Sequence, residues 1–177
     1  HKTSLVPIIL CGGKGTRLRP LTYTSAKQLI PVANKPTISY GIEAIVEAGI
    51  TDIGVIVGET RKEIMAALGD GSQFGAKFTF IEQDAPRGLA HAVMIAEDFM
   101  AGESFLMYLG DNIVRSGVST FVQQFKANSP NAMVLLNAVP NPHEYGVVEL
   151  DDGKVLRLVE KPKEPKTNLA LVGVYLF

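Results

Sequence analysis

Two patterns of apolar residues alternate over the first 130 residues of the chain. Short apolar runs such as 5–10 are typical of parallel strands that are buried on both faces of a sheet. Between these runs, apolar residues recur at spacings of three and four, which is typical of helices that bury one face. The pattern predicts strands over 5–10, 53–57, 77–81 and 105–109, and helices over 37–48, 60–68, 88–100 and 119–127.

Local signals mark the ends of two of these helices. Pro36 precedes the first predicted helix and Gly49 follows it, which suits a helix start and a C-terminal cap. Thr60 and Glu63 have the spacing of a capping box, in which each side chain bonds the backbone N–H of the other residue. We therefore expect the second helix to begin at this pair.

The pattern changes after Asn131. Segments typical of strands then follow one another without a helical repeat, and Asp151-Asp152-Gly153 is typical of a hairpin turn. We predict strands over 132–139, 146–150, 155–160 and 169–177. A strand–helix series followed by strands predicts an α/β fold with a mixed, mostly parallel sheet and helices on both faces.

Length and charge narrow the classes of function. With 177 residues the chain is long enough for one domain with a substantial core. Its 17 basic and 18 acidic residues give a net charge of −1, which provides no general attraction to nucleic acid. Cys11 is the only cysteine, so no intramolecular disulfide can form, and no apolar run is long enough to span a membrane. We expect a cytoplasmic protein with neither a nucleic-acid nor a membrane partner.

A glycine-rich and basic segment, residues 10–32, follows the first predicted strand. Gly12, Gly13 and Gly15 allow several backbone amides to converge on an anion. The segment also carries the cations Lys14, Arg17, Arg19 and Lys27. It is not a Walker A loop, because no Ser or Thr follows a Gly-Lys pair, and it lacks the third glycine of the dinucleotide-binding fingerprint. We expect it to bind phosphate groups in another way.

The sequence of this segment resembles a known signature. Leu10-Cys11-Gly12-Gly13-Lys14-Gly15-Thr16-Arg17-Leu18, with Lys27-Gln28 and Pro31-Val32, is similar to that of the sugar-1-phosphate nucleotidylyltransferases, and most similar to their glucose-1-phosphate thymidylyltransferase members. The resemblance extends over the whole chain. Cys11 departs from the usual alanine, and a small buried thiol should be tolerated there.

The resemblance implies a three-layer Rossmann-like nucleotidyltransferase fold. It implies one nucleotidyltransferase domain over 1–177 that is incomplete at its C-terminus, with a nucleotide-binding half over 1–130 and the start of a sugar-phosphate-binding half over 131–177. It also implies the substrates dTTP and glucose 1-phosphate, which give dTDP-glucose and pyrophosphate with Mg²⁺ as cofactor. Some alternatives are left open. The substrates could be UTP or another sugar 1-phosphate, the chain could be a nucleotide-binding module of little activity, and it could form a homo-oligomer.

Candidate metal and base contacts lie directly after predicted strands. Asp111 follows the strand 105–109, and Gly110-Asp111-Asn112 matches the metal-binding segment of the family, whose second carboxylate lies beyond residue 177. The amide of Gln83 can pair with the imide edge of thymine or uracil, and Gly88 lets backbone approach a flat base. The resemblance implies that Gln83 and Gly88 read the pyrimidine.

Each expected role falls on named residues. The resemblance assigns nucleotide binding to Leu10, Gly12, Gly13, Gly15, Thr16, Arg17, Gln83 and Gly88. It assigns sugar-phosphate binding to Lys27, Asn112, Gly146, Glu160, Lys161 and Val172, and catalysis to Arg17, Lys27 and Asp111, with Asp111 as the metal ligand. Taken without the resemblance, Glu160 and Lys161 would be an ordinary ion pair at a strand edge.

The implied reaction needs no general base. A phosphate monoester has a second pKa of about 6, so the attacking oxygen of glucose 1-phosphate is already mostly ionised at neutral pH. The reaction still requires that the substrates are positioned and that the charge of their phosphates is neutralised. The resemblance assigns these roles to Arg17, Lys27 and Lys161. We therefore expect His91 and His143 to be structural.

Overall fold

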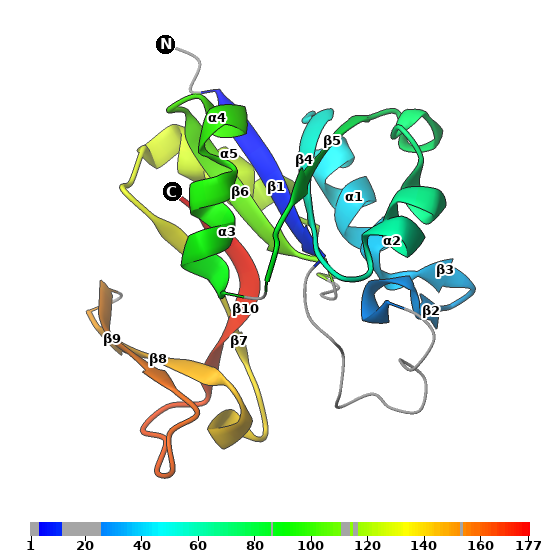
Figure 1. Ribbon diagram of the computed structural model, residues 1–177. Coiled ribbons are helices and arrows are strands. Elements are labelled where there is room, and N and C mark those ends of the chain that lie inside the picture. Colours follow the sequence, from blue (N-terminus) through cyan, green and yellow to red (C-terminus); the bar gives the residue numbers. More distant parts are fainter. Residues whose placement is uncertain (1–3, 12–25, 86, 111–113, 115–116, 153) are drawn as a thin grey trace.

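One sheet runs through the whole molecule in the computed structural model, which describes residues 4–11, 26–85, 87–110, 114, 117–152 and 154–177. Its strand order is β5-β4-β1-β6-β10-β8-β9, and β7 also pairs with β10 (Figure 1). The parallel part consists of β1 (Leu5–Cys11), β4 (Asp52–Val57), β5 (Lys77–Glu82) and β6 (Ser104–Leu109). The antiparallel part consists of β7 (Met133–Ala138), β8 (Gly146–Asp151), β9 (Lys154–Glu160) and β10 (Leu169–Leu176).

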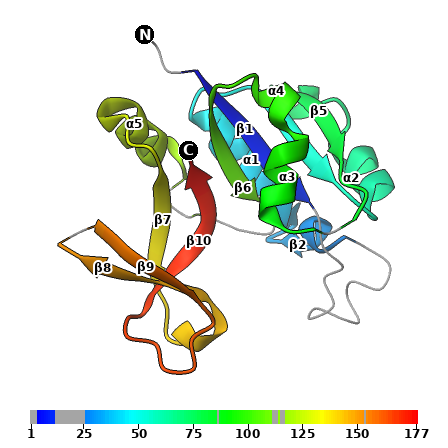
Figure 2. The same cartoon turned by 60° about the vertical axis from the view of Figure 1, so that its left-hand side comes forward.

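Strand β10 joins the two parts. It runs antiparallel to β6, with Val174 opposite Tyr108, and it pairs with both β7 and β8 farther along. A register shift between Val172 and Tyr175 interrupts its pairing with β7. Figure 2 shows the hairpin of β8 and β9 projecting beyond β7 and β10, away from the helices. The mixed α/β architecture predicted from the sequence is confirmed.

Helices cover both faces of the parallel part. On one face lie α1 (Thr37–Glu47), α2 (Arg61–Leu68) and α5 (Ser119–Asn128), whose buried residues share one apolar cluster. On the other face lie α3 (Leu89–Ile95) and α4 (Glu97–Met100), which contribute to a second cluster (Figure 1). Neighbouring residues of β1 alternate between the two, since Ile8 joins the second cluster and Ile9 the first. This two-sided burial explains why the central strands are apolar throughout.

Several short elements were not predicted. A two-stranded ribbon of β2 (Pro31–Val32) and β3 (Lys35–Pro36) turns at Ala33 and Asn34, which both have positive φ. Short 3-10 helices form at η2 (Lys27–Leu29), η3 (Ser72–Phe74) and η4 (Pro142–Glu144). No helix in the described part of the chain is both long and apolar enough to span a membrane.

Two local predictions are wrong. The helix predicted over 88–100 is broken at Ala96, a fully buried residue with φ −92° and ψ 2° that ends α3 and precedes α4. The predicted capping box does not form, because Thr60 has φ −93° and ψ 18° and makes no side-chain cap bond. Glu63 instead accepts a hydrogen bond from the backbone N–H of Ala26, at 2.8 Å. A contact with a distant segment therefore replaces the local one.

Candidate functional site

The carboxyl ends of the parallel strands lie at one edge of the sheet. Leu10, near the end of β1, is opposite Leu109 of β6 and Ile56 of β4. Gln83 follows β5 directly, and its backbone N–H donates to Val57 O at the end of β4, at 2.8 Å. The strands that follow β1 in the chain lie on both of its sides, with β4 and β5 on one side and β6 on the other. Ligands of open α/β sheets bind at such a switch point, beyond the carboxyl ends of the strands.

Gly110 brings the ends of two strands and η2 together. Its backbone N–H donates to Leu10 O at 2.9 Å. A Cβ at Gly110 would lie 3.0 Å from Leu10 O, 3.3 Å from Cys11 Sγ and 3.4 Å from Gln28 Cγ. A side chain here would be crowded by these atoms, and with glycine in this place Gln28 packs against the strand ends, where it is 1% exposed. Lys27, its neighbour in η2, is thereby placed at the same edge of the sheet.

Both ends of the segment around Lys27 are tied to helices. Ala26, just before it, is 2% exposed and donates its N–H to Glu63 of α2. Ile30, just after η2, accepts bonds from the backbone N–H and the hydroxyl of Thr37 at the start of α1, at 3.1 and 2.8 Å. The structure therefore fixes Lys27 through backbone contacts of its neighbours.

Gln83 and Gly88 are close together, as the assignment to one base requires. The side chain of Gln83 is buried, and its Nε2 lies 3.0 Å from His91 Nδ1 and 3.5 Å from Gly88 O. Gly88 precedes α3 with φ 90° and ψ 177°, a conformation that favours glycine. Apart from the adjacent residues, no atom of the described part of the chain lies within 4 Å of the place where its Cβ would stand. Its backbone is thus open to a ligand on that side.

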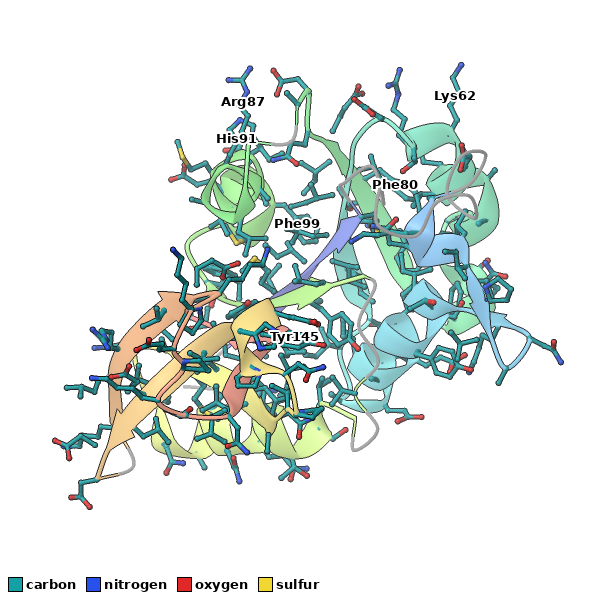
Figure 3. All side chains as sticks on the ribbon, turned by 90° about the horizontal axis from the view of Figure 1, so that it is seen from below. Lys62, Phe80, Arg87, His91, Phe99 and Tyr145 are labelled. Atoms are coloured by element: carbon teal, nitrogen blue, oxygen red, sulfur yellow. The ribbon has the colours of Figure 1, made fainter. Side chains whose placement is uncertain are left out.

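His91 is a site neighbour that the sequence reasoning missed. It lies on α3 near Arg87, which forms an ion pair with Asp84 at 2.7 Å (Figure 3). The predicted helical position of His91 is confirmed, but its ring also contacts Gln83. The spacing of eight residues across a strand–helix turn gave no signal for this contact.

Gly146, Glu160 and Lys161 lie together on the β8–β9 hairpin. Gly146 is opposite Glu160, and a Cβ on Gly146 would lie 3.0 Å from Glu160 Oε2. Lys161 Nζ lies 3.6 Å from Glu160 Oε1; the side chain of Glu160 is largely exposed and that of Lys161 is about half exposed. The backbone N–H of Lys161, a residue with φ 42°, donates to Tyr145 O at 3.0 Å.

Strand β10 supplies two further residues. Val172 is opposite Leu135 of β7, next to the register shift. The pKa of Tyr175 is raised above its ordinary value, first by burial and then by the negative charge of Glu160. Tyr175 is therefore within electrostatic reach of Glu160, a relation that the sequence did not reveal.

Part of the expected site lies outside the described residues. This part contains Gly12, Gly13, Gly15, Thr16, Arg17, Asp111 and Asn112. Among the residues that the structure does describe, no group of three or more His, Cys, Asp or Glu side chains could hold a metal ion. The described candidates form two groups, one at the ends of the parallel strands and one on the β8–β9 hairpin with β10.

Comparisons with known proteins agree with this architecture. The sequence model of the Nucleotidyl transferase family matches residues 6–177. A glucose-1-phosphate thymidylyltransferase of Streptomyces griseus is 57% identical over 171 residues, which are 96% of this chain and 48% of that protein. The chain thus spans about half the length of this curated relative.

Solved structures give the same result. A Bacillus anthracis protein assigned as a glucose-1-phosphate thymidylyltransferase, in complex with sucrose, is 36% identical with a TM-score of 0.94, over 98% of this chain and 71% of that one. A UDP-glucose pyrophosphorylase complexed with UDP-glucose is 24% identical with a TM-score of 0.81, over 98% and 76% of the two chains, and is similar in fold. The chain belongs to the nucleotidyl transferase family.

Proposed function

We propose that this chain carries the nucleotide-binding part of an enzyme that transfers a nucleotidyl group from dTTP to glucose 1-phosphate. The observation that carries the proposal is the pairing of a buried Gln83 amide with the open backbone of Gly88 at the carboxyl end of the sheet. A site with a donor and an acceptor at this place suits the imide edge of a pyrimidine. The names of the close relatives support the same substrates.

In this proposal the chain has two functional halves. Residues 1–130 bind the nucleotide, and 131–177 begin the part that binds the sugar phosphate. Gln83, Gly88 and Leu10 contact the base, and the segment with Gly12, Gly13, Gly15, Thr16 and Arg17 holds the triphosphate. The fixed position of η2 supports a role for Lys27 in binding the phosphates.

The β8–β9 hairpin and its neighbours would bind the sugar phosphate. Glu160 is exposed and can accept hydrogen bonds from sugar hydroxyls, while Lys161 can neutralise the phosphate. The small size of Gly146 leaves room for a ring above Glu160, because a side chain there would contact the carboxylate. We also assign sugar-phosphate binding to Val172 and, from the first half of the chain, to Asn112.

The reaction then requires positioning rather than proton transfer. A phosphate oxygen of glucose 1-phosphate attacks the α-phosphorus of dTTP, a new P–O bond forms, and the bond to the β-phosphate breaks with loss of pyrophosphate. Arg17 and Lys27 stabilise the charge that moves onto the leaving group, and Lys161 holds the incoming phosphate. No histidine acts as a base.

The proposed cofactor is Mg²⁺, with Asp111 as its ligand. The described residues form no metal-binding group of their own, and Asp111 lies outside them. Mg²⁺ is usually held by one or two carboxylates and the phosphate oxygens of the substrate, and it would supply charge neutralisation at the triphosphate.

Pyrophosphate release tests the proposal. The purified protein is incubated with Mg²⁺, with dTTP, UTP, dCTP or ATP, and with glucose 1-phosphate or galactose 1-phosphate. We expect the fastest release with dTTP and glucose 1-phosphate, slower release with UTP, and little with dCTP or ATP. Binding of dTTP without release would indicate a nucleotide-binding module, and binding of none of the four would contradict the proposal.

A further inference from the structure

The neighbours of Gln83 determine which way its amide faces. Gly88 O, 3.5 Å from Gln83 Nε2, can only accept hydrogen bonds. A reversed amide would bring Oε1 toward this carbonyl and place two acceptors against each other. The NH₂ group therefore belongs on this side, and it also faces His91 Nδ1 at 3.0 Å.

This arrangement specifies the state of His91. A ring nitrogen that accepts from an NH₂ group carries no proton, so a neutral His91 must hold its proton on Nε2. Gln83 Nε2 then has one acceptor in His91 Nδ1 and a second, more distant acceptor in Gly88 O. Its Oε1 remains as the acceptor that the side chain can offer to a ligand.

We propose that His91 is a positioning residue that selects thymine and uracil over cytosine. This inference rests on the proposed function, since it assumes that Gln83 meets the base. Thymine and uracil carry an N–H at position 3, which can donate to Gln83 Oε1, whereas cytosine carries an unprotonated acceptor there. Gly88 O fixes the side on which the NH₂ group lies, and His91 Nδ1 stabilises this orientation by accepting from the same group, so Gln83 presents an acceptor and rejects a base that presents another acceptor.

Without His91, the amide loses the partner at 3.0 Å and keeps only the longer contact at 3.5 Å. Both orientations then become accessible, and the reversed one offers NH₂ to the N3 atom of cytosine. Loss of His91 should therefore weaken dTTP binding and strengthen dCTP binding relative to it. A residue that only supports α3 would weaken both nucleotides equally.

A matched pair of variants separates these roles. His91→Asn retains a polar oxygen at the δ position, which can accept from Gln83, while His91→Leu places carbon atoms there with the same branching. Calorimetric titration gives the dissociation constants of dTTP and dCTP for each protein, and their ratio is the selectivity. His143→Leu is the control, because His143 lies on η4 and is largely exposed.

We expect His91→Leu to lower the selectivity for dTTP by about tenfold or more, the effect of one mispaired hydrogen bond in a buried site. We expect His91→Asn to restore it to within about threefold of wild type, and His143→Leu to leave it unchanged. Unchanged selectivity in a folded His91→Leu protein, or its loss in His91→Asn as well, would overturn the role of His91.

A measurement on the wild-type protein needs no variant. Nitrogen NMR with dTTP bound should show His91 as a neutral ring with its proton on Nε2 and an unprotonated Nδ1. A proton on Nδ1 would mean that the ring donates to Gln83 Oε1, and the proposal would be overturned.

The binding measurements separate the failure of the two proposals. If the wild-type protein binds neither nucleotide, the proposed function itself fails. If the wild-type protein prefers dTTP and His91→Leu is as selective, only the role of His91 fails.

Discussion

Gly110 and Gly58 each follow a strand of the parallel sheet, but only one of them is confined by backbone. A Cβ at Gly110 would stand 3.0 Å from Leu10 O, whereas for a Cβ at Gly58 the nearest described atom outside the adjacent residues is Gln83 O, at 3.8 Å. Neither glycine has positive φ. The difference between them is therefore one of space, which makes them a matched pair.

We expect Gly110→Ala to lower the free energy of unfolding by about 1–3 kcal/mol, because the new methyl group forces the end of β1 or η2 to shift. Gly58→Ala should be neutral or slightly stabilising, since alanine restricts the unfolded chain. Urea unfolding of both variants provides the comparison. Equal stability of the two variants would show that the strand ends yield to the added methyl group.

The raised pKa of Tyr175 predicts how the stability of the protein depends on pH. Burial and the charge of Glu160 raise the pKa of Tyr175, so the folded protein keeps the phenolic proton to a higher pH than the unfolded chain does. This contribution to stability is complete below the pKa of the unfolded chain, about 10, and is lost as the pH rises through the folded value.

As the pH rises from about 9 to about 11, we expect the free energy of unfolding to fall less for Tyr175→Phe than for wild type. Glu160→Gln should also reduce the loss, but less, because burial is the larger cause of the shift. Urea unfolding at several pH values measures both. Parallel curves for wild type and Tyr175→Phe would show that Tyr175 titrates alike in the folded and unfolded states.

At the scale of elements, the contact between α2 and η2 is the least local feature near the site. Glu63 is 37 residues from Ala26, yet its carboxylate accepts the N–H that precedes Lys27. The same glutamate that would have capped its own helix instead orders a loop from another part of the chain. Helix α2 thereby helps to position the segment that carries Lys27.

We expect Glu63→Ala to lower the free energy of unfolding by about 1 kcal/mol, since the buried N–H of Ala26 loses its acceptor. In the proposed function it should also weaken dTTP binding through Lys27, and Glu63→Gln should retain both properties because its amide oxygen still accepts. Lys62→Ala is the control, as Lys62 lies on the same helix and points outward (Figure 3). Thermal unfolding and dTTP titration measure the effects; a loss as large in Lys62→Ala would argue against the contact.

At the scale of the whole molecule, β10 holds the parallel and antiparallel parts of the sheet together. Leu176 is fully buried and lies between Leu106 of β6 and Met133 of β7. It belongs to the larger apolar cluster, which also includes residues of α1 and α5. Leu156 of β9, in contrast, is 67% exposed.

We expect Leu176→Ala to lower the free energy of unfolding by about 2–5 kcal/mol, the range for a large aliphatic side chain removed from a core. Leu156→Ala should change it by no more than about 0.5 kcal/mol. If β10 unites the two parts, near-ultraviolet and far-ultraviolet circular dichroism should report one common urea transition for wild type. Similar losses in the two leucine variants would contradict the packing of β10.

The sequence by itself determined the strands of the main sheet, most of the helices and the family. Periodicity is a local property, and a strand covered by helices on both faces must be apolar at every position, so segments such as 5–10 and 53–57 could be found without coordinates. Gly49, with φ 81°, ends α1 as predicted. The chemical character of Gln83 and of the glycine-rich segment was also evident, because a residue type carries its donors, acceptors and conformational freedom with it.

Tertiary structure decided what these residues contact. Glu63 bonds Ala26 instead of its own helix, a buried Ala96 breaks a helical repeat, and Gln83 faces His91 across a turn. Each case depends on contacts between different secondary-structure elements. The free energy of such a contact comes from burial and geometry between distant residues, and no spacing along the chain records it.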